Sequence, residues 1–219
     1  MADTLHFETV TPSLRKVLED IISEPMFAPF ALAGGTSLSL RLGHRISVDI
    51  DLFTNVPYGS LDFERYEDYL SSRFLFFDCP DTSGITSFGK SYYVGESEFD
   101  NIKVDMFYHD DIVEPYETID GIRLVTMNDV AAMKTDVVAR KGRKKDFWDL
   151  HELLNYYTIE QLLDLHRQRH EWDHDRQAII SNFTDFSLAD EMLDPICLRG
   201  KDWGLIKLDF HESIGLTIV

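Results

Sequence analysis

The 219-residue sequence has few of the features that would tie it to a membrane or make it depend on disulfide bonds. Its two cysteines, Cys79 and Cys197, are far apart and form no CxxC pair, so neither a disulfide framework nor a cysteine zinc site is indicated. The opening residues, MADTLHFETV, lack the basic and apolar segments of a signal peptide, and no apolar run approaches the roughly 20 residues that span a bilayer. We therefore expect a cytoplasmic protein that does not enter membranes.

Basic residues are also scarce. Lys and Arg total 21 against 39 Asp and Glu, which gives a formal net charge of -18 at pH 7. Such a charge repels phosphate backbones at long range and argues against broad binding of DNA or RNA. The exception is the stretch RKGRKK at residues 140–145, for which two interpretations stay open: a local contact with nucleic acid or phosphate, and a solvated turn between helices.

Several common catalytic motifs are missing. The sequence contains no P-loop, GxSxG or HExxH string, which argues against a Walker-type NTP hydrolase, a serine hydrolase and a zinc protease. Internal repeats and low-complexity tracts are absent as well.

The first part of the chain mixes helical and strand patterns. Residues 11–24 place apolar side chains at helical spacing behind a Thr and a Pro, which predicts a helix. A short apolar strand, two glycines and a helix from about 36 to 42 follow, and the alternation in RISVDIDLF predicts a half-buried strand over 45–53. Residues 60–72 are predicted to be helical. Between 74 and 124, FLFFD, ITSFGK, SYYVGE, NIKVDMFYH and a hairpin near Gly121 predict antiparallel strands.

From residue 126 onward the pattern becomes helical. The segments MNDVAAMKTDVVARKG, KKDFWDLHELLNYY, TIEQLLDLHRQRH and DHDRQAIISNF each predict a helix. We therefore expect an α+β protein with a mixed core at 1–125 and a helical sub-domain at 126–219. The C-terminal aromatics Trp203 and Phe210 are expected to fill a core or to cap the sheet rather than to stack on bases.

Three aspartates form the candidate chemical centre. Asp49 and Asp51 flank Ile50 on a predicted strand, where the period of two points both carboxylates to one face. Asp105 lies in the strand-like IKVDMF and could join them if that strand lies beside the first, although it could also simply pair with Lys103. Clustered carboxylates repel one another unless cations intervene, so the set suits Mg²⁺.

A glycine turn precedes the aspartates. Gly34 and Gly35, followed by Thr36 and Ser37, predict a tight turn from strand to helix. Amides, hydroxyls and the helix dipole at such a turn form a cradle for an anion such as a nucleotide triphosphate. The order along the chain brings phosphates and metal to one edge of the sheet.

These residues carry a resemblance to a known family. The segment GGTSLSLRLGHRISVDIDLF, residues 34–53, resembles the signature of the AbiEii/AbiGii nucleotidyltransferase toxin family, a branch of the polymerase-beta-like superfamily. Arg45 and Ser47, which alternate with the Asp pair, are part of the similarity. The segment DVAAMKTDVVARKGRKKDFWDLHELL, residues 129–154, is similar to a second block of that family. The resemblance covers residues from about 30 to 155, and the remainder matches no motif.

The resemblance implies a fold and a set of roles. The fold would be a polymerase-beta-like core at 1–125, and the helical sub-domain at 126–219 would complete the active-site cleft. By the resemblance, Lys134 would contact phosphates and Asp146 would have a nearby polar role. The expected nucleotide-binding residues also include Gly34, Gly35, Thr36, Ser37, Arg45 and Ser47, and the expected metal ligands are Asp49, Asp51 and Asp105.

The implied reaction moves a nucleoside monophosphate from an NTP to an RNA, such as a tRNA end, or to a protein acceptor. An acceptor hydroxyl would attack the α-phosphate in line while Mg²⁺ or Mn²⁺ stabilises the attacking and departing oxygens. Some relatives are toxins neutralised by a cognate antitoxin, which is an expected partner here. The alternative from another class is a non-catalytic module that keeps the fold and binds a nucleotide or a protein.

A second set of residues has metal-ligand character. His166, His170 and His174 recur every four residues, which on one continuous helix would align three imidazoles for a transition metal. Trp172 and Asp173, however, predict a break in that helix. The pattern is therefore more typical of histidines on a polar helix face than of a metal site.

Overall fold

The computed structural model describes residues 4–80 and 88–215. The chain divides into two compact units, Met1–Leu42 with Ser47–Thr126, and Gly43–Ile46 with Met127–Val219. The sequence placed a boundary near residue 125, and the main division falls between Thr126 and Met127; the short segment Gly43–Ile46, however, belongs with the later residues. Within the described ranges, no helix is both long and apolar enough to cross a bilayer.

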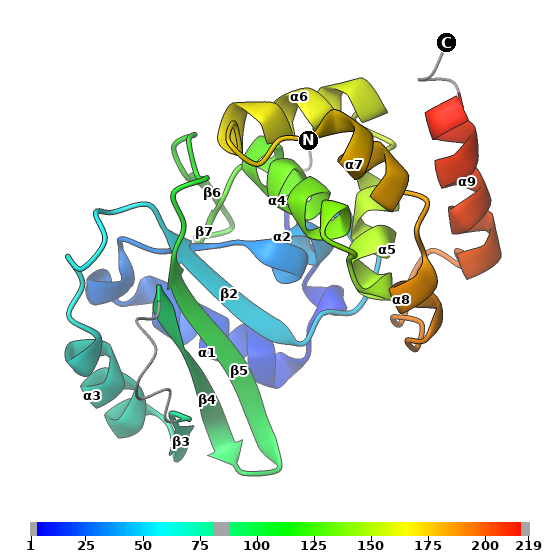
Figure 1. Cartoon of the computed structure of the whole chain (residues 1–219). Coiled ribbons are helices and arrows are strands. Elements are labelled where there is room, and N and C mark those ends of the chain that lie inside the picture. Colours follow the sequence, from blue (N-terminus) through cyan, green and yellow to red (C-terminus); the bar gives the residue numbers. More distant parts are fainter. Residues whose placement is uncertain (1–3, 81–87, 216–219) are drawn as a thin grey trace. The chain divides into compact units, whose positions relative to one another are not determined.

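The first unit contains a seven-stranded mixed sheet in the order β3-β4-β5-β2-β1-β7-β6 (Figure 1). Its centre pairs β2 with β5 in parallel and β2 with β1 in antiparallel orientation. The β6–β7 hairpin turns at Asp120 and Gly121, both of which have positive φ. The strands are β1 (Ala31–Leu32), β2 (Asp49–Thr54), β3 (Phe76–Asp78), β4 (Gly89–Ser97), β5 (Asp100–Tyr108), β6 (Glu117–Ile119) and β7 (Ile122–Leu124).

The hydrophobic core of this unit lies on one face of the sheet. Alternate residues of β2, such as Ile50 and Leu52, are fully buried and share a core cluster with Leu14 and Leu18 of the first helix. The intervening residues of β2, which include the two aspartates, are half-buried on the opposite face. The helices and 3-10 turns of this unit are η1 (Phe7–Thr9), α1 (Pro12–Ser23), η2 (Pro25–Phe27), α2 (Gly34–Leu42) and α3 (Phe63–Arg73).

The second unit is helical. Helix α4 packs against α5, α6 and α7, and α5 also packs against α8 and α9. Aromatic rings fill this second core: Phe147 contacts Phe186, Trp203 and Phe210, and Phe210 is fully buried. The helices are α4 (Met127–Ala139), α5 (Lys144–Leu153), α6 (Ile159–Arg169), α7 (Arg176–Asn182), α8 (Ser187–Asp190) and α9 (Trp203–Gly215).

Two strand predictions require correction. The strand expected over 45–53 begins only at Asp49. Residues 43–46 belong to the helical unit, where Arg45 forms an isolated backbone bridge with Cys197 and its side chain pairs with Asp149. These long-range contacts override the strand pattern there. The segments ITSFGK and SYYVGE, expected as separate strands, contribute to one strand from Gly89 to Ser97, and residues 85–87 of the first lie outside the described residues.

Other predictions are confirmed. The helix break expected at Trp172 and Asp173 is present, because α6 ends at Arg169 and α7 begins at Arg176. Helix α9 had no counterpart among the predicted elements. The α+β class is confirmed by the mixed sheet of one unit and the helices that accompany it.

Candidate active site

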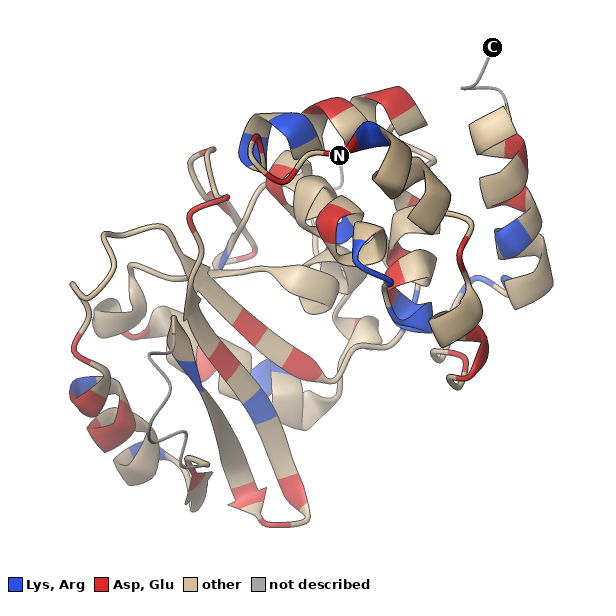
Figure 2. Ribbon diagram, in the orientation of Figure 1, with Lys and Arg blue, Asp and Glu red and all other residues tan. Residues whose placement is uncertain are grey.

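The three aspartates lie on two neighbouring strands. In the parallel pairing of β2 with β5, Asp51 is directly beside Asp105, and Asp49 is beside Lys103. Alternation along each strand places all of these side chains on the half-buried face, while the intervening residues enter the core. Figure 2 shows the acidic positions side by side on the two strands. The condition set for Asp105, that its strand lies beside the strand of Asp49 and Asp51, is therefore met, and the alternative pairing with Lys103 is present as well.

Asp105 has two hydrogen-bond donors. Ser91 Oγ donates to its Oδ1 at 2.6 Å, and Lys103 Nζ lies 2.6 Å from its Oδ2. Burial acts to lower the pKa of Lys103, but the hydrogen bond to Asp105 and the negative charges of Asp105, Asp49 and Asp51 outweigh it, so that the pKa is raised. The raised pKa of Lys103 therefore shows that negative charge is concentrated on this face of the sheet.

The carboxylates share a face without forming a closed cage. Among residues 4–80 and 88–215, two groups of three ligand side chains have all their ligand atoms within 4.8 Å of one another, and neither contains Asp49, Asp51 or Asp105. Mg²⁺, however, is usually held by one or two carboxylates together with waters and substrate phosphates rather than by a protein cage. An open row of hard oxygen donors fits that mode of binding.

The glycine turn lies against this row. Gly34 has a φ of +63°, and a Cβ built on it would lie 2.1 Å from Asp51 Oδ2, so only glycine allows the backbone to approach the carboxylate this closely. The Ala33 N–H donates to the Asp51 carbonyl oxygen at 2.8 Å, which ties the turn to β2. Gly34 and Gly35 are half-buried.

The side chains after the glycines point inward. Thr36 is 1% exposed, and its hydroxyl contacts Ser47 Oγ at 2.8 Å and donates to the Asp49 carbonyl oxygen. Ser37 is fully buried at the start of α2. Thr36 and Ser47 thus hold the beginning of β2 through buried hydroxyl contacts, whereas the two glycines before them are only half-buried.

Lys134 and Asp146, the expected residues of the second block, contact each other in the helical unit. Lys134 Nζ lies 2.8 Å from Asp146 Oδ1 and 2.7 Å from Asp149 Oδ2. Burial lowers the pKa of Lys134, but the charges of Asp149 and Asp146 more than compensate and raise it. The ammonium is therefore charged, 6% exposed as a residue and neutralised from two sides.

Asp149 is a residue that the sequence analysis missed. Arg45 donates to both of its carboxylate oxygens, from Nε at 2.6 Å and from Nη2 at 2.8 Å, and His44 Nε2 lies 2.8 Å from Oδ1. Burial opposes ionisation of Asp149, but the charges of Arg45 and Lys134 and the hydrogen bonds from His44 and Arg45 lower its pKa well below the ordinary value. These contacts place Arg45 in a buried ion-pair network with Asp149.

A periodic signal could have revealed this residue. Asp146, Asp149 and Glu152 recur every three positions on α5 and are all fully buried. Glu152 is paired with Arg199 and with Lys201, whose Nζ lies 2.6 Å away. Acidic residues repeated on one helix face between apolar ones indicate a face that meets basic partners.

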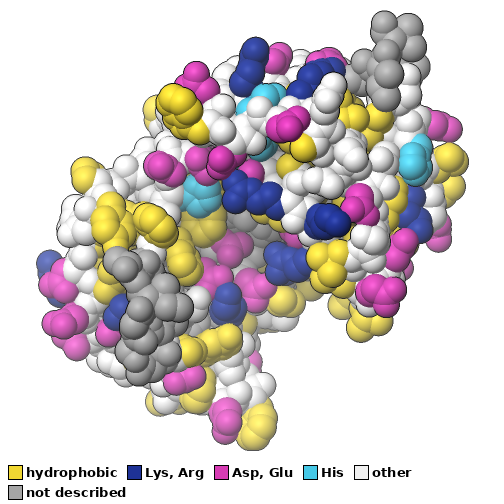
Figure 3. Space-filling model, in the orientation of Figure 1, with side chains coloured by type: hydrophobic (Ala, Val, Ile, Leu, Met, Phe, Trp, Pro, Cys, Tyr) yellow, Lys and Arg dark blue, Asp and Glu magenta, His cyan; other side chains and the backbone are white. Residues whose placement is uncertain are grey.

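The basic stretch at 140–145 is largely neutralised within the helical unit. Arg140 lies 2.9 Å from Asp136, Lys141 3.2 Å from Asp185 and Lys144 3.0 Å from Asp194. Arg143 lies 3.1 Å from Asp146. Figure 3 shows basic side chains next to acidic ones on this face of the molecule. These pairs favour the interpretation as a turn between helices, but the turn is not solvated throughout, because Lys144 is buried.

Comparison with known proteins identifies the family. The sequence model of the nucleotidyl transferase AbiEii toxin family, assigned to type IV toxin–antitoxin systems, matches residues 16–213. The chain belongs to this family. The AbiEii resemblance is therefore confirmed, and the match extends beyond residues 30–155 at both ends. The AbiEii family is one of nucleotidyltransferases, the class of enzyme that the sequence predicted.

Relatives of this AbiEii chain include an uncharacterized protein of Aquifex aeolicus (strain VF5), aq_aa25, which is 35% identical over 145 residues. That alignment covers 64% of this chain and 65% of the relative, slightly under two thirds of its length.

Similar solved structures confirm the fold. JHP933 from Helicobacter pylori has a TM-score of 0.54 at 19% identity, with 93% of this chain and 88% of that chain covered. MenT4, the nucleotidyltransferase toxin Rv2826c from Mycobacterium tuberculosis H37Rv, has a TM-score of 0.53 at 14% identity, with 85% and 75% covered.

Proposed function

We propose that this protein is the toxin of a toxin–antitoxin pair and transfers a nucleoside monophosphate from an NTP to a hydroxyl group of an RNA, with a tRNA end as the first acceptor to test. The observation that carries the proposal is the placement of Gly34 against Asp51, which is itself beside Asp105. A phosphate-binding turn in contact with a row of carboxylates is what nucleotidyl transfer requires.

Asp49, Asp51 and Asp105 are the proposed ligands of Mg²⁺ or Mn²⁺. The donor set is made only of carboxylate oxygens, which suits Mg²⁺ and Mn²⁺ better than softer ions such as Zn²⁺ or Cu²⁺. When bound, the metal would neutralise charge on the phosphates and stabilise the attacking and departing oxygens. Lys103 already offsets part of the negative charge beside Asp105, so the row needs fewer cations than three free carboxylates would.

The remaining roles in the first unit fall to the glycine turn. Peptide N–H groups at Gly34 and Gly35, at the start of α2, would donate hydrogen bonds to phosphate oxygens of the NTP. Thr36, with Ser47, would keep β2 and the turn in register through the contacts of its buried hydroxyl. Catalysis by such a site depends mainly on positioning and charge neutralisation.

Lys134 is proposed to contact the phosphates of the NTP, as the family resemblance implies. Asp146 is proposed to have a polar role beside it. Lys134→Ala would remove one of the cations that contact the buried carboxylates of Asp146 and Asp149, and removal of one partner of a buried pair costs about 3–5 kcal/mol. Loss of activity in Lys134→Ala could therefore come either from the loss of a catalytic group or from unfolding. Lys134→Arg, which keeps the positive charge, is the better probe of the proposed role.

The decisive experiment supplies the protein with each labelled NTP in turn, Mg²⁺, and separate pools of cellular RNA and protein. We expect label to enter RNA with one preferred NTP. Asp51→Asn should abolish transfer, because removal of a proposed metal ligand takes away charge stabilisation of the reacting phosphate. Asp100→Asn, an exposed aspartate on the same strand as Asp105, is the matched control and should keep full activity.

Each other outcome has a defined meaning. Label in the protein pool alone would replace the RNA acceptor with a protein acceptor. Nucleotide binding without transfer to either pool would favour the non-catalytic binding module. Co-expression with the product of the adjacent gene should relieve growth arrest if that gene encodes the antitoxin. Equal transfer by the wild type and Asp51→Asn would contradict the proposed site.

A further inference from the structure

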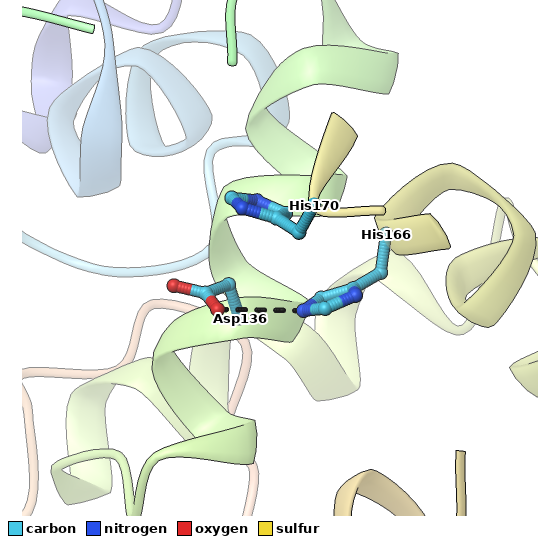
Figure 4. A group of neighbouring side chains, drawn as sticks. All are labelled: Asp136, His166 and His170. Carbon is cyan, nitrogen blue, oxygen red and sulfur yellow. Dashed lines mark hydrogen bonds and ion pairs between the residues drawn. The ribbon is translucent and has the colours of Figure 1, made fainter. Parts of the chain in front are cut away.

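The helical unit contains a cluster of ligand side chains that the proposed function does not use. Asp136 projects from α4, His166 lies on α6, and His170 is the residue that caps the C-terminal end of α6 (Figure 4). One ligand atom from each of the three residues lies within 4.8 Å of the others. His166 is 1% exposed, so an imidazole and a carboxylate meet here largely away from solvent.

The spacing of these atoms suits a small transition-metal ion. His166 Nε2 lies 3.3 Å from Asp136 Oδ1. A tetrahedral zinc ion about 2.0–2.1 Å from nitrogen and oxygen ligands keeps those ligands about 3.3 Å from one another. His170 lies past the last helical residue, with its ring centroid 4.6 Å from that of His166, and it supplies the third ligand atom within the same 4.8 Å.

We propose that Asp136, His166 and His170 form a binding site for a divalent transition-metal ion of the zinc type that links α4 to the C-terminal end of α6. Two imidazoles and one carboxylate leave a fourth position for water, an arrangement that zinc accepts. The carbonyl groups at the end of α6 add negative potential that favours a cation.

His174 acts in this site as a positioning residue. Its Nδ1 lies 3.0 Å from His166 Nδ1, on the side of the ring opposite to Asp136. A metal-binding histidine usually donates its second ring N–H to a fixed acceptor, which sets the tautomer and the orientation of the ring. Here a hydrogen bond from His166 to His174 leaves the lone pair of His166 Nε2 directed at the metal.

A network without metal is the competing arrangement. With the proton of the His166–His174 contact on His174, His166 Nε2–H would donate to Asp136 and no ion would be needed. Arg140 Nη2 also contacts Asp136 Oδ1, at 2.9 Å. That arginine side chain is 62% exposed and has Asp173 as a second partner at 3.5 Å, so it can leave Asp136 at little cost.

The test measures uptake of Zn²⁺ and Co²⁺ by metal-free protein in excess Mg²⁺, by calorimetry, by thermal unfolding and by the visible absorption of tetrahedral cobalt. The variants are Asp136→Asn and His170→Gln, which avoid the fully buried His166. His211→Gln, an exposed histidine on α9, is the matched control. Asp51→Asn checks that the ion does not bind at the carboxylate row.

We expect the wild type, His211→Gln and Asp51→Asn to bind one ion, to gain thermal stability and to show the cobalt band. Asp136→Asn and His170→Gln should bind at least about tenfold more weakly, and His174→Gln about 10- to 100-fold more weakly. Absence of uptake by the wild type, or equal uptake by Asp136→Asn and His170→Gln, would overturn the metal site and leave the hydrogen-bonded network in its place.

Discussion

At the scale of single residues, the candidate active site depends on the close approach of the Gly34 backbone to the carboxylate of Asp51. Gly34 lies where any side chain would collide with Asp51, and the hydroxyl of Thr36 is directed at the backbone of Asp49. The turn and the carboxylate row are thus one structural unit. A substitution in the turn should therefore displace the side chain of Asp51.

Gly34→Ala tests this coupling. The added Cβ would lie 2.1 Å from Asp51 Oδ2 at a φ of +63°, so Asp51 must move and nucleotidyl transfer should fall by at least about a hundredfold. Gly59→Ala is the matched control, because its φ is +79° with nothing within 4 Å of the new Cβ. Gly59→Ala should lose only about 1–2 kcal/mol of stability, the cost of a left-handed backbone for alanine, and should keep its activity. Transfer rates and thermal midpoints measure both effects, and equal loss of activity in the two variants would contradict the coupling.

At the scale of elements, α5 determines how the second unit is held together. Its buried acidic face binds Lys134 of α4, the segment with His44 and Arg45, and the basic residues after Cys197. Charge pairing, rather than chain continuity, is why four residues between α2 and β2 belong to the helical unit. Buried pairs of this kind are costly to break from one side.

The pH dependence of stability follows from Asp149. Its pKa is lowered in the folded protein, so its contribution is fully present above the unfolded value of about 3.9 and is lost as pH falls through the folded value. At neutral pH, Asp149→Asn should lower the free energy of unfolding by about 3–5 kcal/mol. The difference between the wild type and the variant should then shrink as pH falls below about 4.

Denaturant titrations at a series of pH values measure this difference. Asp100→Asn, on the exposed end of β5, serves as the control and should differ little from the wild type at any pH. A difference between the wild type and Asp149→Asn that stays constant into the acid range would show that the lowered pKa of Asp149 does not contribute to stability.

At the scale of the whole molecule, charge limits how the proposed acceptor RNA can be recruited. The chain carries a net charge of -18, and four residues of its basic stretch are paired with carboxylates of the same unit. Long-range attraction therefore cannot supply the affinity for RNA. Recognition must come from short-range contacts around the reacting end.

The salt dependence of the KM for RNA should accordingly be weak. Proteins that neutralise many phosphates lose about 10³- to 10⁵-fold in affinity between 50 and 200 mM salt. Here the KM should change by less than about tenfold over that range, because salt also screens the repulsion between the protein and RNA. Steady-state rates on the identified RNA measure it, with KM for the NTP as the internal control. A steep rise of KM for RNA with salt would show an extended basic surface.

Local sequence patterns determined the parts of the fold that carry the chemistry. The period of two put Asp49 and Asp51 on one face, the glycine pair predicted the turn, and the helical periods predicted α4 to α7. These features follow from neighbours along the chain, so they can be derived without knowledge of distant contacts.

Tertiary structure decided which distant residues meet. That Asp105 lies beside Asp51, that Lys134 is buried between Asp146 and Asp149, and that Arg45 leaves its predicted strand for Asp149 all depend on pairings over long sequence separations. The break after α6 was visible in the sequence, yet only the packing of α6 on α4 brings His166 to Asp136. A local pattern specifies which face a side chain occupies, whereas its partner on that face is fixed by the packing of whole elements.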